Sequence, residues 1–239
     1  MAGTSGGVVV IASFVLDMVT HVPRRPRTGE SLIGEGFGMF VGGKGCNQAI
    51  AAARAGASVR VLGRLGADDF GKQFQRVLAR EGIGARWVTV DNEEGTGVAF
   101  PLIEPDGQNS IVIVPRANRR LTSDDILAGQ EAFEGAGALL VQMEVSLEAV
   151  WKAIDLAHER GLCVLFNPAP VPDPLPTFPA ELWAKIDYLL PNEREIEALT
   201  ALPAHDIPQI EHAARSLTLR GCRSVVVTLG DRGALWVPG

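Results

Sequence analysis

The chain has 239 residues, of which 46% are hydrophobic and 21% are charged. These proportions are typical of a globular protein, and they exclude a disordered chain or a fibrous repeat. The formal charge of −6 argues against a surface dedicated to nucleic acids or to anionic membranes. We therefore expect neither nucleic acid nor a membrane among the partners.

The cysteines indicate a reducing compartment. Cys46, Cys163 and Cys222 lie far apart and are odd in number, which fits neither a disulfide framework nor a zinc site. The apolar run over residues 8–16 lacks the preceding basic residue and the cleavage site of a signal peptide. Because no stretch reaches the ~18 apolar residues of a membrane span, we expect a cytoplasmic protein.

The first half of the chain mixes helices with short strands. In chain order, the patterns predict a buried strand over residues 8–12, short strands near 32–33 and 39–41, a helix over 46–55, a strand over 59–62, a helix over 69–80, and strands over 87–90, 97–103 and 110–114. The last three strands are predicted to be antiparallel, with a turn at residues 105–107. They suggest a small sheet inserted into a larger core.

The second half alternates between helices and strands. The patterns predict a helix capped by Ser123 and running to about residue 133, a strand over 138–142, a helix over 147–160, a strand over 162–166, a short strand over 188–190, helices over 193–199 and 208–220, and a strand over 225–229. Repeated β-α units with apolar strands predict an α/β fold, in which a mostly parallel sheet is covered by helices on both faces.

A glycine-rich segment over residues 38–48 is the densest local signal. The spacing of Gly38, Gly43 and Lys44 almost satisfies the phosphate-loop pattern, but Gly45 stands where that pattern needs a hydroxyl for Mg²⁺. Glycines before a helix let a ligand approach the backbone, and the helix N-terminus offers N–H donors to oxygen atoms. Lys44 and Asn47 lie one turn apart, so both are candidates to contact one polyhydroxylated ligand.

Several motifs together resemble a known family. The run over residues 42–49, GGKGCNQA, continues into AAARAGA over 51–57 and resembles the first signature of ribokinase-like, PfkB-type carbohydrate kinases. Further motifs follow in collinear order at residues 63–71, 96–99, 142–144, 167–170, 191–195 and 227–230. The resemblance implies one ribokinase-like α/β core over residues 1–239, with a small antiparallel β lid built from parts of 14–41 and 96–116.

The resemblance implies ATP-dependent phosphorylation of a sugar hydroxyl and assigns residues to the sugar. By this likeness the sugar contacts are Asp17, Gly42, Gly43, Lys44, Asn47 and Glu144. A carboxylate such as that of Asp17 makes strong hydrogen bonds to hydroxyls, and Glu144 follows a strand at the edge where α/β sheets bind ligands. Val15 stands where the family usually has Asn, and Ala12 where it usually has Gly, which puts ribose as the substrate in doubt.

The resemblance also implies a nucleotide side. Asn192, Thr228 and Gly230 correspond to residues that contact ATP, and Glu195 to one that acts on Mg²⁺ through water. Asn192 and Glu195 also have the spacing of a helix capping box, and a capped N-terminus is compatible with an anion site. The cofactors implied are ATP and Mg²⁺, with a monovalent cation such as K⁺ as a further option.

The family's catalytic segment, Gly-Ala-Gly-Asp, does not occur in these residues. We therefore expect the base aspartate beyond Gly239, the C-terminal part of the fold to be absent, and the 239-residue chain alone to be inactive. Two alternatives stay open: a nucleoside kinase of the same family, and an inactive sugar-binding or dimerising fragment. Because the family's lid often pairs into a dimer clasp, a homodimer is also an expectation.

Overall fold

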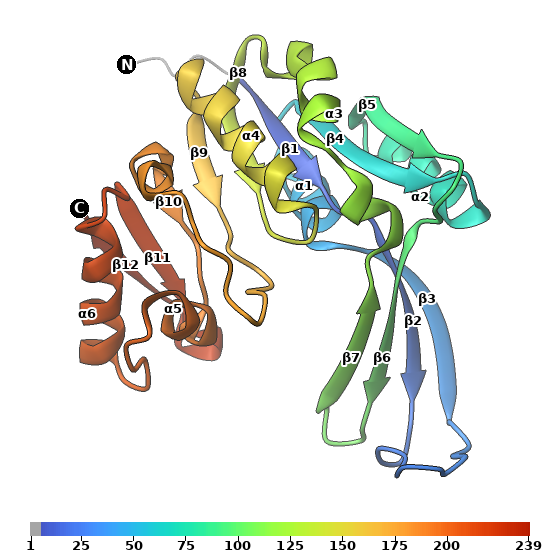
Figure 1. Cartoon of the computed structure of the whole chain (residues 1–239). Coiled ribbons are helices and arrows are strands. Elements are labelled where there is room, and N and C mark those ends of the chain that lie inside the picture. The colour runs from blue at the N-terminus through green and yellow to red at the C-terminus, as the bar shows by residue number, and fades with distance from the viewer. Residues whose placement is uncertain (1–5) are drawn as a thin grey trace.

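The structure is a computed structural model and describes residues 6–239. Its core is an eight-stranded sheet with the strand order β12-β11-β10-β9-β8-β1-β4-β5 (Figure 1). The strands are β1 (Gly7–Ala12), β4 (Val59–Gly66), β5 (Gly84–Asp91), β8 (Ala136–Val141), β9 (Cys163–Phe166), β10 (Tyr188–Leu189), β11 (Ser224–Thr228) and β12 (Ala234–Pro238). All neighbours pair in parallel except β11 and β12, which form an antiparallel hairpin. The predicted mostly parallel sheet is confirmed.

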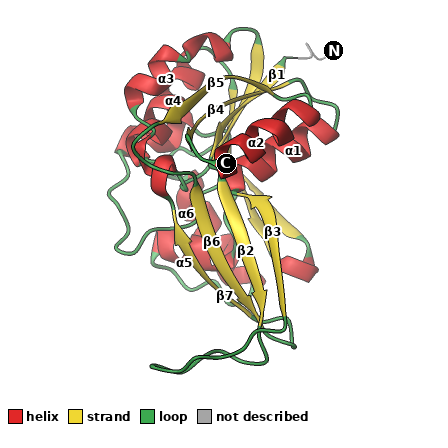
Figure 2. Ribbon diagram, turned by 90° about the vertical axis from the view of Figure 1, so that its right-hand side faces the viewer, coloured by secondary structure: helices red, strands yellow, loops and turns green. Residues whose placement is uncertain are grey.

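Helices cover both faces of this sheet (Figure 2). On one face, α1 (Lys44–Arg54) and α2 (Asp69–Arg80) pack against apolar residues of β1 and β4. On the other face, a second apolar cluster joins the sheet to α3 (Ser123–Ala128), α4 (Leu147–Glu159), α5 (Glu193–Thr200) and α6 (Ile207–Thr218). The 3₁₀ segments are η1 (Arg116–Arg120), η2 (Gln130–Phe133), η3 (Ala180–Lys185) and η4 (Gly230–Arg232).

A second sheet of four strands projects from the core as a lid (Figures 1 and 2). Its order is β3-β2-β6-β7, from β3 (Gly36–Gly42), β2 (Val15–His21), β6 (Gly97–Ile103) and β7 (Asn109–Val114). β2 pairs antiparallel with β3 but parallel with β6, so the lid is only partly antiparallel. Strand β2 was not predicted, and residues 32–33 form no strand.

Two predicted elements need correction. Strand β5 pairs in parallel with β4, not in an antiparallel sheet, because β4, α2 and β5 form a β-α-β unit whose crossover helix returns the chain in the same direction. The predicted helix over 123–133 ends at Ala128, and its N-cap is Thr122, not Ser123. It stops at Gly129, where a Cβ would lie only 2.6 Å from the Leu62 side chain.

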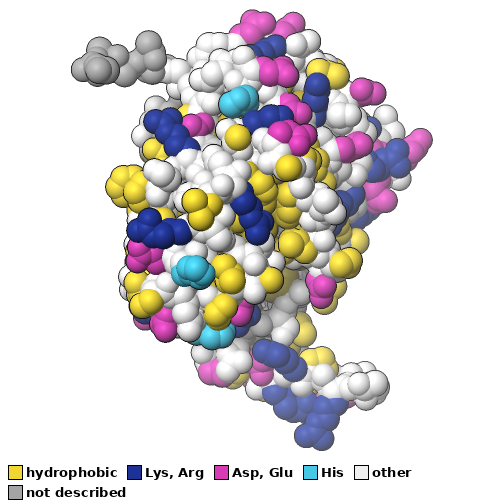
Figure 3. Space-filling view, turned by 60° about the vertical axis from the view of Figure 1, so that its left-hand side comes forward, with side chains coloured by type: hydrophobic (Ala, Val, Ile, Leu, Met, Phe, Trp, Pro, Cys, Tyr) yellow, Lys and Arg dark blue, Asp and Glu magenta, His cyan; other side chains and the backbone are white. Residues whose placement is uncertain are grey.

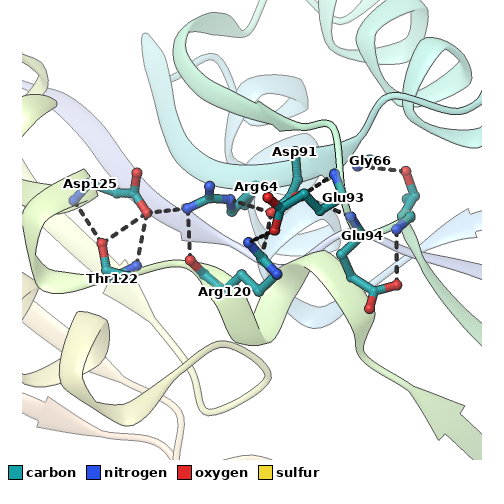
Figure 4. Close-up of polar contacts among 10 residues, drawn as sticks. Arg64, Gly66, Asp91, Glu93, Glu94, Arg120, Thr122 and Asp125 are labelled. Carbon is teal, nitrogen blue, oxygen red and sulfur yellow. Dashed lines mark hydrogen bonds and ion pairs between the residues drawn. The ribbon is translucent and has the colours of Figure 1, made fainter.

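An ion-pair network supports the base of the lid (Figure 4). Arg64 on β4 bridges the buried carboxylate of Asp91 at 2.9 Å and the partly exposed carboxylate of Asp125 at 2.8 Å. Arg120 binds Asp91 at 2.8 Å from the other side. Burial alone would raise the pKa of Asp91. The hydrogen bonds from the backbone N–H groups of residues 93 and 94, together with the charges of the two arginines, outweigh burial, so the pKa is lowered overall. The network fixes η1, which follows β7.

The segment η1 in turn holds the point where the lid leaves the core. Asn118 on η1 is fully buried and donates its side-chain amide to the Phe14 carbonyl at 2.8 Å. Its Oδ1 accepts the Phe14 backbone N–H, also at 2.8 Å. Because β2 begins at the next residue, this pair of hydrogen bonds sets the direction in which β2 and the rest of the lid extend.

Positive side chains gather at the far end of the lid (Figure 3). The loop between β2 and β3 carries Arg24, Arg25 and Arg27, all exposed. Arg24 pairs with Glu30, and Arg25 pairs with Glu104 of the neighbouring hairpin at 2.7 Å. These pairs bind the loop to itself and to the turn between β6 and β7. Among the described residues, no helix is both long and apolar enough to cross a membrane.

Candidate functional site

The candidate site lies at the carboxyl ends of the parallel strands, where open α/β sheets bind ligands. Ser13 follows β1, Glu144 follows β8, and Asn167 follows β9. Farther along the same edge, Asn192 follows β10, and an isolated bridge pairs it with Thr228 at the end of β11. The topology thus brings residues that are more than 200 positions apart in the sequence to one edge of the sheet.

Glu144 is the most heavily bonded carboxylate of the site, and it is only 8% exposed. Its Oε2 accepts the Ser13 hydroxyl at 2.7 Å and the Lys44 backbone N–H at 2.6 Å. Its Oε1 lies 3.2 Å from the Lys44 ammonium. The carboxylate therefore joins β1, β8 and the first turn of α1, and Oε1 keeps acceptor capacity for a ligand hydroxyl.

The N-terminus of α1 is already occupied by protein atoms. Lys44 donates its backbone N–H to Glu144, Gly45 donates to Ser13 Oγ at 3.0 Å, and Cys46 donates to the Ser13 carbonyl at 3.1 Å. The expectation that these N–H groups serve a ligand is therefore wrong for these three residues. Acceptors within the protein, on Glu144 and Ser13, satisfy these otherwise unpaired N–H groups at the start of the helix instead.

The glycines before α1 allow this close packing. Gly43 has φ +90°, and a Cβ there would lie 2.5 Å from the Ser13 carbonyl oxygen. A Cβ at Gly42 would collide with Oδ2 of Asp17. The two glycines thus have a structural role in seating the loop against β1 and β2, whether or not they also contact a ligand.

Asp17 lies in the middle of β2, on the lid. Its carboxyl packs against the backbone of Gly42, the residue before Gly43 at the N-cap of α1. Burial raises the pKa of Asp17, the negative charge of Glu144 raises it further, and Lys44 lowers it. The lid and the core therefore each contribute one carboxylate to the same electrostatic environment.

One cleft joins the two predicted sides of the site. It has a volume of about 590 Å³, and its lining includes Lys44, Asn47, Asn192, Glu195 and Thr228. Five residues predicted from distant motifs therefore lie along one surface. Among the other predicted residues, Glu144 lines an adjoining cavity, while Asp17, Gly42, Gly43 and Gly230 are not part of either lining. Gly230 opens η4 beyond the strand end, with φ +62°.

Asn192 and Glu195 form the predicted capping box. Asn192 Oδ1 accepts the Glu195 N–H at 2.8 Å, and Glu195 Oε2 accepts the Asn192 N–H at 2.8 Å. Burial raises the pKa of Glu195, while its bond from Asn192 and the charge of Lys44 lower it. Lys44 is thus the cation shared by Glu144 and Glu195, the carboxylates on the two sides of the cleft.

Three polar residues at the site escaped prediction as site residues. Ser13 orients Glu144, while Gln48 and Asn167 line the cleft. Gln48 Oε1 is buried without a hydrogen-bond partner among the described residues. Asn167 fell within a recognised motif, and its position directly after an apolar strand was an available signal. For Ser13 the same signal existed, but its partner Glu144 lies 131 residues away.

Comparison with known proteins agrees with this geometry. The family model described as pfkB family carbohydrate kinase matches residues 6–239. The deoxyribokinase of Salmonella typhi is 36% identical over 230 residues, which cover 96% of this chain and 74% of that protein. The ribokinase of Haemophilus influenzae is 35% identical, over 94% of this chain and 72% of that protein.

A solved structure gives the same result for the fold. The ribokinase of Arabidopsis thaliana, complexed with ribose and ATP, superposes with a TM-score of 0.85 at 31% identity. The superposition covers 98% of this chain and 75% of that one. The resemblance that the motifs indicated is confirmed, and the chain belongs to the pfkB family of carbohydrate kinases.

Proposed function

We propose that this protein binds a sugar and ATP side by side and transfers the terminal phosphoryl group to a sugar hydroxyl. The observation that carries the proposal is the single cleft lined by Lys44 and Asn47 at one end and by Asn192, Glu195 and Thr228 at the other. Ribokinases and a deoxyribokinase among the relatives support the same activity. Phosphoryl transfer depends mainly on positioning and charge stabilisation, which such a cleft provides.

In this proposal the sugar lies between lid and core. Asp17 and Glu144 accept hydrogen bonds from its hydroxyls, Asn47 supplies an amide, and Gly42 and Gly43 let it approach the backbone. Lys44 lies between Glu144 and the nucleotide side, so its ammonium can face a transferring phosphoryl group. Asn192, Thr228 and Gly230 bind the nucleotide.

The residues of the cleft fit Mg²⁺ bound through water. Within residues 6–239, no group of three His, Cys, Asp or Glu side chains gathers to hold a metal directly. Mg²⁺ usually keeps several waters and binds substrate phosphates with one or two carboxylates. Glu195 Oε2 is used in the capping box, which leaves Oε1 to hold such a water. When bound, the ion would neutralise phosphate charge.

Sugar binding can be measured directly by calorimetry over a panel of pentoses, hexoses and nucleosides. We expect a sugar to bind and Asp17→Asn to weaken it at least about tenfold, because a charged acceptor becomes a neutral one. Asp124→Asn, an exposed carboxylate on α3, serves as the matched control. Nucleoside binding without sugar binding would favour the nucleoside-kinase alternative, and no binding would refute the proposal.

Turnover is a separate question, which concerns the catalytic base. We propose that the base is not among residues 6–239, because the Gly-Ala-Gly-Asp segment in which the family carries it does not occur there. ADP release should therefore stay at background for this chain. Turnover by the 239-residue chain would refute this placement of the base.

We further propose that the protein is cytoplasmic and forms a homodimer through the lid. Large apolar side chains are exposed on it, including Phe37 on β3 and Val112 on β7 at 67% and 65%. Burying them against a second copy would gain hydrophobic free energy. Sedimentation should show a dimer that Val112→Asp dissociates, whereas Leu219→Asp, an exposed apolar residue after α6, leaves it intact.

A further inference from the structure

Arg116 has an unusual backbone conformation at the base of the lid. Its φ is +47°, in the left-handed region that residues with a Cβ seldom adopt. Among the described residues, Ala201 is the only other non-glycine residue with a positive φ, and it caps the C-terminus of α5, where this conformation is common. Arg116 instead opens η1, shortly after β7 ends. A strained residue of this kind persists only where surrounding contacts hold it.

The side chain of Arg116 makes such contacts. Its Nε lies 3.1 Å from Oε1 of Glu94, and its Nη1 donates to the Thr96 carbonyl at 3.1 Å. The same Nη1 lies 3.8 Å from Oδ2 of Asp68, the N-cap of α2. A Cβ at Gly95 would collide with the guanidinium, so this glycine lets the guanidinium lie against the backbone. We call Arg116, Glu94, Thr96 and Asp68 the lid clamp.

The lid clamp joins two lid strands to the core. Thr96 directly precedes β6, and Arg116 follows β7. The backbones of the two connections also pair, because the Ala117 N–H donates to the Gly95 carbonyl at 3.0 Å. Thr96 in turn donates to Asp68 through its N–H at 2.8 Å and through its hydroxyl at 2.7 Å. The clamp therefore holds the base of β6 and of β7 against the start of α2.

Strand pairing connects the clamp to the proposed sugar site. β6 pairs in parallel with β2, and Asp17 lies opposite Ala99. Ala99 is three residues beyond Thr96, which is roughly 10 Å along the strand. A shift of β6 at the clamp is therefore transmitted to Asp17 through the lid sheet. Arg116 itself lines neither the cleft nor the adjoining cavity, so it can act on a sugar only through the position of other residues.

We propose that Arg116 is a positioning residue of the sugar site. Its side chain holds β6 at the base of the lid, and β6 keeps the Asp17 carboxylate in place for a sugar hydroxyl. The contacts of the clamp offset the strain of the left-handed backbone. Glycine would adopt this backbone without strain but could make none of the side-chain contacts. The proposal rests on the proposed sugar-binding function.

Substitutions at this position separate positioning from stability. The probe is the tightest-binding sugar of the pentose and hexose panel, starting with D-ribose and 2-deoxy-D-ribose, measured by calorimetry on the whole chain. Arg116→Gly and Arg116→Ala should both weaken binding about 3- to 10-fold, because a hydrogen bond to a charged group is misaligned but not removed. Alanine keeps the backbone strain that glycine relieves, so only Arg116→Ala should also have the lower urea midpoint of the two. Arg116→Lys keeps a cation beside Glu94 and should bind closer to the wild type.

The control removes an exposed ion pair from the core. Arg86 on β5 pairs with Glu131 on η2 at 3.2 Å, and neither belongs to the lid clamp. Arg86→Ala should therefore keep the wild-type affinity. Wild-type affinity in Arg116→Gly, or an affinity that follows the urea midpoint across the variants, would overturn the positioning role and leave the proposed function standing. Failure of the wild type to bind any sugar would instead overturn the proposed function, and this inference with it.

Discussion

Ser13 offers the sharpest test of how the site is assembled. It is fully buried directly after β1, and its hydroxyl both donates to Glu144 Oε2 at 2.7 Å and accepts the Gly45 N–H at 3.0 Å. The substitution Ser13→Ala removes this hydroxyl and adds nothing that could clash. The Gly45 N–H at the start of α1 then loses its partner, and Glu144 loses one of its donors.

The structure sets the size of the effect. A hydrogen bond to a charged group contributes about 1.5–3 kcal/mol, and a buried N–H left without a partner costs about 1–3 kcal/mol. Allowing for partial relaxation, Ser13→Ala should lower the free energy of unfolding by about 2–4 kcal/mol. Because natural domains have about 5–15 kcal/mol of stability, the variant should still fold.

Equilibrium urea denaturation, followed by circular dichroism, measures this loss. The midpoint should fall with an unchanged slope, since the exposed surface on unfolding does not change. The control is Ser31→Ala, because Ser31 is exposed in the lid loop, and its effect should stay within ~0.5 kcal/mol. The reasoning is refuted if Ser13→Ala costs no more than this control.

A double-mutant cycle identifies the route of the effect. If Ser13 acts through Glu144, then Ser13→Ala should cost less in a Glu144→Ala background than in the wild type. The remaining cost would come from the Gly45 N–H alone. Full additivity of the two substitutions would contradict the hydrogen bond between Ser13 and Glu144 as the cause.

Three further predictions concern the lid carboxylate and a helix cap. Gly42→Ala should weaken sugar binding about tenfold in calorimetry, because the new Cβ displaces the Asp17 carboxylate; unchanged affinity would contradict this contact. The Asp17 carboxylate is a stronger hydrogen-bond acceptor when ionised than when protonated, and its pKa is raised above 3.8, so sugar affinity should fall as the pH drops through a midpoint above 3.8; a midpoint at or below 3.8 would disagree. Thr122→Ala should cost about 1 kcal/mol in urea unfolding and Ser123→Ala less than ~0.5 kcal/mol, because Thr122 is the N-cap of α3; equal costs would reject this assignment.

Local patterns predicted local structure well. The helix α2 has the predicted bounds, and the capping box of Asn192 and Glu195 forms as its three-residue spacing indicates. The strand β2 gave no clear signal, because residues around Asp17 are half-buried on both faces of the lid and do not alternate between apolar and polar. A strand that is partly exposed on both faces lacks the two-residue alternation of apolar and polar side chains from which strands are predicted.

Contacts between distant residues could not be predicted from spacing. The motifs placed Lys44 and Glu144 in one site. They did not predict the hydrogen bonds through which Glu144 and Ser13 bind the N–H groups at the start of α1. Nor does a sequence pattern say whether a strand such as β5 joins the core or the lid. That choice depends on which strand has a free edge where the chain returns after α2. Here the free edge belongs to β4, and β5 pairs with it.

The division of the site between two sheets has a mechanical consequence. Asp17 belongs to the lid and Glu144 to the core, so the distance between these carboxylates depends on how the lid meets the core. Asn118 fixes that junction by binding both backbone groups of Phe14, and the Arg64, Asp91 and Arg120 network holds η1 in place beneath it. The affinity for a sugar that bridges both carboxylates is therefore set partly by residues that never touch it.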